Sequence, residues 1–260
     1  MLYIGVRGHR GAGKSTISYL VGNTLDYILR NETEDYDKLY RIWCDDIVKD
    51  EKVIHDSQLN HVYFDSFSDT LKLWVKLLIG CPNSYMYDDY YKDHMIINMK
   101  DFSYKVYEEI PDNIKMYSHE ELYDVMPKDR APITITKNIY ISLRNFIMYF
   151  GLEVMQRFFG SNVWVKSLNC SSEFYNSIFD SGIKIFTDVK TPGEVTYIKN
   201  KDGYIIKVSR PNHKKSPQKT DKLSQDNRFD FEITIRDDLY DTKDIIWEIS
   251  NKILYGKKED

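Results

Sequence analysis

One short motif near the start of the chain constrains the fold more than any other feature. Residues 8–16 read Gly-His-Arg-Gly-Ala-Gly-Lys-Ser-Thr, which matches GxxxxGK[ST], and they follow an apolar run from Leu2 to Val6 that predicts a strand. In such a turn small residues let backbone N–H groups point inward, and the start of the next helix adds positive potential. The pattern therefore predicts a phosphate-binding loop, formed by Gly8, Arg10, Gly11, Ala12, Gly13, Lys14, Ser15 and Thr16.

Two side chains of this loop have separate expected roles. Lys14 would reach the β- and γ-phosphates of ATP, and the Ser15 hydroxyl would coordinate the Mg²⁺ that bridges them. The apolar residues of 17–25 recur at helical spacing, which predicts a helix directly after the loop. Glycine-rich turns also join strands to helices in proteins that bind nothing. The order of strand, loop, lysine, serine and helix is what favours phosphate binding.

The rest of the chain alternates strand-like and helical patterns. This alternation predicts an α/β fold, a three-layer parallel sheet flanked by helices. The expected strands after the first are 40–44, 61–64, 183–187, 204–209 and 231–235, and the expected helices are 69–79, 139–159, 163–179, 192–200 and 241–255. In the last helix Ile245, Ile249, Ile253 and Leu254 are expected to point inward.

Irregular, proline-punctuated segments interrupt this pattern and suggest the organisation of the chain. Residues 80–138 are rich in tyrosine and acid and predict a mixed insertion over the active site, not a separate domain. The core then consists of 1–79 and 139–260. Residues 210–228 are polar and lysine-rich between two expected strands, which predicts a lid.

The bulk properties exclude several classes of protein. A net charge of −4 offers no overall attraction to nucleic acid or to an acidic membrane. Three widely spaced cysteines, Cys44, Cys81 and Cys170, indicate neither a disulfide framework nor a zinc site. No signal peptide or membrane span is expected, so the predicted location is the cytoplasm. Whether the chain forms a homodimer is open.

Acidic residues that directly follow expected strands are the candidates for holding Mg²⁺ or a substrate donor. Ligands of parallel α/β sheets gather at the carboxyl ends of the strands. Asp188 follows the buried run 183–187 and is the leading candidate. Asp45, Asp46 and Asp65 compete with it, and for each of them a solvated loop carboxylate is an equally good interpretation.

Neither a Ser/His/Asp nor a Cys/His arrangement is evident in the chain. Transfer to a phosphate acceptor needs no strong general base, because the acceptor oxygen is already anionic; it needs positioning and positive charge. The basic residues singled out for that role are Lys72, Arg144, Arg157, Lys166, Lys190 and Arg210. Each of them taken alone is a typical surface charge.

Four further elements resemble those of bacteriophage deoxynucleoside monophosphate kinases. Residues 67–72, Phe-Ser-Asp-Thr-Leu-Lys, are similar to the family's apolar-A-[GD]-P-apolar-K element. Residues 143–151 with Trp-Val-Lys at 164–166 are similar to its R-x-x-apolar-x-x-x-G … W-V-K block. Residues 187–190 with Glu194 resemble D-x-R … E, and 208–211 resemble V-R-P. Order and spacing agree over most of the chain.

The resemblance implies a nucleoside monophosphate kinase fold, ATP as donor and a deoxynucleoside monophosphate as acceptor. By position, Lys72 and Arg144 would contact the phosphates. The nucleotide pocket would be lined by Gly151, Trp164, Asp188 and Glu194, with Lys190 and Arg210 also binding substrate. Lys14, Arg144 and Asp188 would be catalytic.

The chain departs from the family pattern at three positions. Ser15 stands where the family often has Asp, Thr70 replaces a proline, and Lys190 replaces an arginine. Lysine cannot form the two-pronged contact that arginine makes to a phosphate, which weakens the assignment of Lys190.

Two other interpretations stay open at the level of sequence. In the first, the same kinase chemistry acts on a modified base in DNA or on another small phosphorylated metabolite. In the second, the chain is a nucleotide-binding switch ATPase that has no acceptor. The base preference is equally open, although Tyr90, Tyr91 and Tyr107 could stack on a base.

Overall fold

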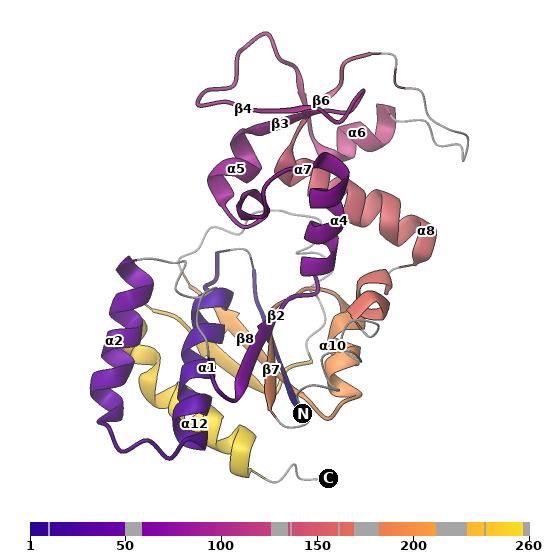
Figure 1. The fold of residues 1–260 in the computed structure, drawn as a ribbon. Coiled ribbons are helices and arrows are strands. Elements are labelled where there is room, and N and C mark those ends of the chain that lie inside the picture. The colour runs from indigo at the N-terminus through magenta and orange to yellow at the C-terminus, as the bar shows by residue number, and fades with distance from the viewer. Residues whose placement is uncertain are drawn as a thin grey trace. The chain divides into compact units, whose positions relative to one another are not determined.

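The fold was analysed in a computed structural model, which describes residues 1–9, 11–49, 59–125, 135, 137–160, 162–168, 182–211, 228–236 and 238–256. Two compact units make up the chain (Figure 1). The first unit combines Met1–Phe67 with Asn169–Asp260, and the second is Ser68–Leu168.

The first unit is built on a five-stranded parallel sheet. Its strands are β1 (Leu2–Arg7), β2 (Val62–Asp65), β7 (Ile183–Val189), β8 (Tyr204–Ser209) and β9 (Phe231–Thr234). The strand order is β2-β7-β1-β8-β9, and every neighbouring pair is parallel. The predicted α/β architecture with a parallel sheet is confirmed at this level.

Helices cover both faces of this sheet. They are α1 (Lys14–Leu29), α2 (Tyr36–Lys49), α10 (Pro192–Lys199) and α12 (Lys243–Tyr255), the last preceded by the 3₁₀ turn η3 (Leu239–Thr242). Helices α1, α2 and α12 lie on one side of the sheet and α10 lies on the other (Figure 1). Four apolar residues of α1 are fully buried, namely Ile17, Leu20, Val21 and Leu25. The result is the expected three-layer arrangement.

The prediction of a strand at 40–44 is wrong. These residues lie inside α2, where Tyr40, Cys44 and Ile47 recur at intervals of three and four and are buried against the core. Helical spacing extends over the whole of 36–47, and a window of five residues is too short to reveal it. Asp45 and Asp46 are therefore helical residues and do not follow a strand.

A smaller correction concerns α12. Ile246, Ile249 and Ile253 are its buried isoleucines, whereas Ile245 is 37% exposed. The expected inward position of Ile245 is wrong because the helix is rotated toward Ile246, which keeps Ile249 and Ile253 on its buried face.

The second unit has its own four-stranded sheet, in the order β4-β3-β6-β5. Its strands are β3 (Met95–Asn98), β4 (Tyr104–Val106), β5 (Met116–Tyr117) and β6 (Tyr140–Ser142). Its helices are α4 (Asp69–Ile79), η1 (Asn83–Met86), α5 (Asp89–His94), α6 (His119–Val125), α7 (Leu143–Met148), the π-helix η2 (Tyr149–Gln156) and α8 (Arg157–Phe159). The helix expected at 69–79 is confirmed.

The boundaries of this unit differ from the insertion predicted at 80–138. Val75 of α4 and Phe146 of α7 belong to the same buried core as Ile97 of β3 and Ile141 of β6, so the flanking helices belong with the insertion. The helix expected from residue 139 starts only after β6, because 140–142 pair with β3 and β5. Residues 163–168 are helical, and the rest of the helix expected at 163–179 lies outside the described residues.

None of the helices in the described part of the chain is long and apolar enough to cross a membrane. Each of the two units has a buried apolar core of its own.

Candidate active site

The carboxyl end of β1 is a topological switch point of the parallel sheet. From β1 the chain crosses to β2 on one side, whereas β8 leads to β9 on the other side. Neighbouring strands whose connections leave in opposite directions open a crevice at their carboxyl ends, and ligands of parallel α/β sheets bind there. The glycine-rich segment after β1 lies at this point.

The backbone of the segment has the conformation that its glycines permit. Gly11 and Gly13 have φ angles of +75° and +89°, in the left-handed region that disfavours a side chain. Gly8 packs so closely on the backbone of β8 that an added Cβ would collide with the Val208 carbonyl oxygen. Arg10, another predicted member of the loop, lies outside the described residues.

The glycine-rich segment leads into the first turn of helix α1. Among the described residues, no side chain at the N-cap accepts a hydrogen bond from the first amides of this helix. Gly13 occupies the N-cap of α1, makes no side-chain hydrogen bond, and no acid lies in the first turn. Helix α10 differs, because Thr191 and Glu194 form a complete capping box there. The first amides of a helix need partners and carry positive potential. The start of α1 is therefore open to an anionic ligand, and Ser15 in its first turn is exposed.

Lys14 and Asp188 lie together at this edge of the sheet. The Lys14 ammonium donates to the His9 carbonyl oxygen at 3.0 Å and lies 3.7 Å from Asp188 Oδ1. Asp188 Oδ2 forms an ion pair with Lys190 at 2.6 Å. Both side chains of the Lys14–Asp188 pair are largely buried, at 13% and 24% exposed. The structure thus brings together Lys14, Asp188 and Lys190, which sequence placed in the site separately.

The competing acids have other surroundings. Asp65 ends β2 and forms an ion pair with the buried Lys184 at 2.7 Å, and it also accepts the Ser66 amide. Asp45 and Asp46 lie within α2. Among the strand-end acids considered, Asp188 is the one that pairs with Lys14.

Glu194 is buried at the start of α10, where its carboxylate accepts the amides of Lys190 and Thr191. Burial raises its pKa above the ordinary value, and the amide hydrogen bonds oppose that effect. Capping accounts for this residue without a ligand, and its predicted contact with substrate stays a prediction.

The second unit contains a separate cluster of charges around Arg144. This side chain donates to both oxygens of Asp93, with Nη2–Oδ2 at 2.9 Å, and to Asp89 at 3.1 Å. Lys92 bonds to Asp89 at 3.0 Å and to the Tyr87 carbonyl. Lys72, the other predicted phosphate contact, pairs with Asp69 at 2.9 Å and lies over the Tyr87 ring at 4.3 Å.

The charged side chains of this cluster shift the pKa values of one another. Burial lowers the pKa of Lys92, and the nearby charges of Lys72 and Arg144 lower it further, against the raising effect of Asp89. The hydrogen bond to Asp93 raises the pKa of Arg144. The side chains of Lys72, Lys92 and Arg144 are therefore close enough to influence one another. Lys92 was missed at the level of sequence, because nothing in its local pattern separates it from a surface lysine.

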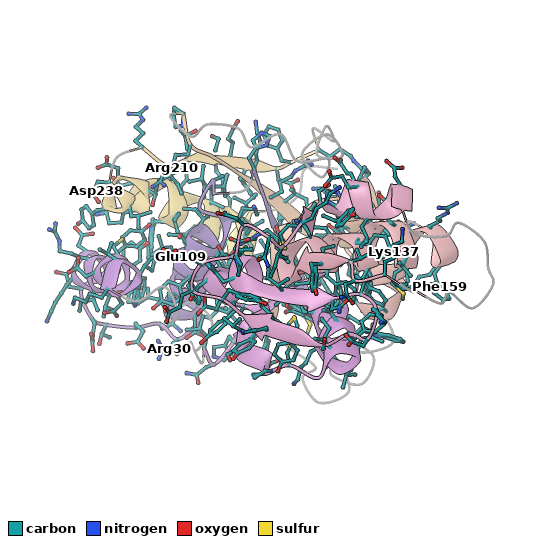
Figure 2. The ribbon with its side chains drawn as sticks, turned by 90° about the horizontal axis from the view of Figure 1, so that it is seen from above. Arg30, Glu109, Lys137, Phe159, Arg210 and Asp238 are labelled. Atoms are coloured by element: carbon teal, nitrogen blue, oxygen red, sulfur yellow. The ribbon has the colours of Figure 1, made fainter. Side chains whose placement is uncertain are left out.

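Other predicted substrate residues have packing roles. An added Cβ on Gly151 would lie 2.7 Å from Leu71 Cδ2, so the glycine permits a close approach of η2 and α4. Trp164 is buried in the core of the second unit. Arg157, Lys166 and Arg210 are exposed, and Arg210, labelled in Figure 2, directly follows β8. Residues 212–227 of the predicted lid lie outside the described residues.

The tyrosines that were considered for base stacking already have aromatic or cationic neighbours. Tyr91 stacks on Tyr85 with ring centroids 3.9 Å apart, and Tyr90 stacks on His94 at 4.2 Å. Tyr107 lies under the Lys105 ammonium at 5.0 Å. One ring face of each is therefore in use within the second unit.

No known protein-family model and no curated protein matches this chain. In the described part of the chain no three His, Cys, Asp or Glu side chains gather as a metal-binding group. A cation held largely by nucleotide phosphates would need only one or two protein ligands.

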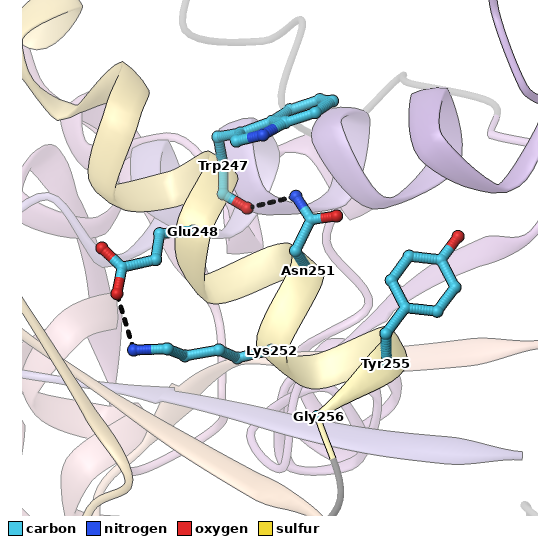
Figure 3. Close-up of a pocket in the computed structure, with 6 residues that line it drawn as sticks. All are labelled: Trp247, Glu248, Asn251, Lys252, Tyr255 and Gly256. Atoms are coloured by element: carbon cyan, nitrogen blue, oxygen red, sulfur yellow. Dashed lines mark hydrogen bonds and ion pairs between the residues drawn. The ribbon is translucent and has the colours of Figure 1, made fainter.

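A shallow hollow of about 460 Å³ lies elsewhere on the first unit, along the outer face of α12 (Figure 3). Its lining residues are Trp247, Glu248, Asn251, Lys252, Tyr255 and Gly256. Two of them, Glu248 and Lys252, bond to one another at 2.6 Å. The hollow includes none of the loop or strand-end residues described above, so it is not part of the candidate active site.

Proposed function

We propose that this protein is an ATP- and Mg²⁺-dependent deoxynucleoside monophosphate kinase, which transfers the γ-phosphoryl group of ATP to a deoxynucleoside monophosphate. One observation carries the proposal. Lys14 is the first residue of a helix that no side chain at its N-cap caps, and it follows two glycines with left-handed backbone, Gly11 and Gly13. It lies at the switch point of the parallel sheet, and its ammonium is close to the carboxylate of Asp188 at the end of β7. These are the features of a phosphate-binding loop.

The first unit would bind the donor. The backbone amides from Gly11 to Thr16 would surround the phosphates, and Lys14 would exchange its contact with the His9 carbonyl for phosphate oxygens. Ser15 and Asp188 would be the protein's contribution to a Mg²⁺ site, and the metal would neutralise charge on the phosphates. Lys190, on the other side of Asp188, would orient that carboxylate.

The second unit would bind the acceptor phosphate. Lys72 and Arg144 occupy the positions at which the family resemblance expects phosphate contacts. The geometry supports this, because both side chains are largely buried and each now binds an anionic carboxylate. The guanidinium of Arg144 binds a carboxylate through two parallel bonds, a geometry that also suits a phosphate. Transfer would then depend on alignment and on charge compensation rather than on a general base.

The deciding experiment is an ADP-release assay with ATP and Mg²⁺ against a panel of deoxynucleoside and nucleoside monophosphates. We expect turnover that depends on a deoxynucleoside monophosphate and vanishes without Mg²⁺. Turnover only with a phosphorylated metabolite or with modified DNA would indicate the alternative kinase. Slow ADP release that no acceptor accelerates would indicate a switch ATPase and would refute the proposal.

A further inference from the structure

The charge cluster of the second unit contains more cations than a single ion pair between helices α5 and α7 would need. Arg144 of α7 and Asp93 of α5 form such a pair by themselves. Lys92 and Lys72 bring two further ammonium groups into the same region, with side chains that are only 17% and 19% exposed. Burial is the main cause of the lowered pKa of Lys92, and repulsion by the charges of Lys72 and Arg144 lowers it further. Each of these cations is paired with a carboxylate, and a phosphate that replaced a carboxylate could bind several of the cations at once.

The carboxylates of the cluster are more exposed to solvent than its cations. Asp93 and Asp89 are 50% and 71% exposed, whereas Arg144 is 20% exposed. Water screens the exposed carboxylate of such an ion pair and so weakens the pair. Either aspartate can therefore turn into water when another anion takes its place at the cations, which themselves need a counter-charge.

We infer that Lys92 is a third ligand of the acceptor phosphate, and that Asp93 occupies the two-pronged face of Arg144 in place of that phosphate until the acceptor arrives. Binding is then an exchange of anions, in which the phosphate displaces the Asp93 carboxylate and gains Lys92 and Lys72 as well. This inference rests on the proposed function, because it assigns the phosphate to an acceptor nucleotide. It adds a ligand and a competing internal carboxylate to the predicted site.

An exchange of anions predicts opposite changes in phosphate affinity when Asp93 or Lys92 is replaced. Removing the Asp93 charge removes a competitor, so phosphate affinity should rise. Removing Lys92 removes a ligand, so affinity should fall. A purely structural network predicts the same sign for both, because loss of either partner would loosen α5 and weaken whatever binds there.

The test measures binding by calorimetry without ATP, using inorganic phosphate and each deoxynucleoside monophosphate as probes. For Asp93→Asn we expect an approximately fivefold lower Kd, the loss of about 1 kcal/mol of competition. For Lys92→Ala we expect a roughly tenfold higher Kd, with Lys92→Arg restoring most of the affinity. Both variants are checked for folding by circular dichroism.

Matched controls separate local exchange from general charge. Asp101→Asn removes an exposed carboxylate of the same unit that bonds only to Ser103 among the described residues, and Lys105→Ala removes an exposed lysine. Both should leave Kd within about twofold, because the interaction of exposed charges is screened. If Asp93→Asn fails to fold, Asp93→Ser takes its place in the test of the exchange, and the comparison of Lys92→Ala with Lys105→Ala tests the third ligand.

An unchanged or raised Kd in folded Asp93→Asn would overturn the exchange, and equal effects of Lys92→Ala and Lys105→Ala would overturn the third ligand. These failures differ from a failure of the proposed function. If the acceptor binds with the expected responses but no phosphoryl transfer occurs, the phosphate site stands and the kinase assignment falls. If phosphoryl transfer occurs but the variants bind the acceptor with unchanged Kd, the kinase assignment is supported and the inference about Lys92 and Asp93 is wrong.

Discussion

The two units present positive charge in different ways. In the first unit the candidate site consists mainly of backbone, with left-handed glycines, an uncapped helix start and one lysine behind them. In the second unit it consists of side chains from three helices, each of them paired with a carboxylate. Backbone amides are held by the fold and need no internal counter-charge, whereas gathered ammonium and guanidinium groups do.

This difference indicates which steps of binding involve rearrangement. A loop of backbone amides is ready for an anion as soon as the sheet and helix form. A cluster of side chains that is neutralised by its own aspartates must first give up those contacts. We therefore expect the donor to bind a preformed site, and the acceptor to bind by exchange of partners.

The largest expected effect is at the backbone-built site. Lys14→Ala should reduce acceptor-dependent kcat by at least about a thousandfold, near 4 kcal/mol, because in the proposed kinase the ammonium would stabilise charge that develops between the β- and γ-phosphates. Lys252→Ala on α12 is the control, since that exposed lysine pairs only with Glu248 among the described residues. Both variants should keep the melting temperature. Turnover within tenfold of wild type would show that the loop is not catalytic.

The next effect concerns the side-chain-built site. Arg144→Lys keeps the charge but loses the two parallel bonds, so the acceptor is no longer aligned. We expect acceptor kcat/KM to fall about a hundredfold, near 2.7 kcal/mol, with the KM for ATP unchanged. Steady-state kinetics with each substrate varied in turn measure the two effects. Nearly wild-type transfer would remove the acceptor assignment from α7.

A matched pair of glycines compares the backbone in the two units. Gly13 and Gly80 both have positive φ, at +89° and +72°, but only Gly13 is crowded, since its added Cβ would meet Ile235 Cδ1 at 2.5 Å. Gly80→Ala should cost about 1 kcal/mol of unfolding free energy for the left-handed backbone, and Gly13→Ala about 2 kcal/mol. Urea denaturation measures both. Equal losses would mean that the loop does not pack on Ile235 as described.

The smallest effect separates packing from binding at Gly151. Gly151→Ala should destabilise the fold by about 1 kcal/mol, since overpacking against Leu71 exceeds the gain in helix propensity. In a Leu71→Ala background the same change should stabilise, and the double-mutant cycle measures this reversal. The KM for the acceptor should not change. A raised KM with unaltered stability would instead favour the predicted role of Gly151 in the nucleotide pocket.

Most of the first unit could be predicted from the sequence, because its signals are local. The runs 183–187 and 204–209 are short and apolar, and they coincide with β7 and β8 to within two residues. The error at 40–44 arose because four or five apolar residues suit a strand as well as one buried turn of a helix. The sheet of the second unit was not expected, since its strands are only two to four residues long.

The amino-acid sequence by itself determined the glycine-rich loop, the helix that follows it and the parallel class of the sheet, because each depends on residues close together in the chain. Only the tertiary structure chose Asp188 over Asp65 as the partner of Lys14, and only it joined Lys92 to Arg144. Those choices depend on distances between residues that are tens of positions or more apart. Such distances follow from strand order and helix packing, and no local pattern of residues records them.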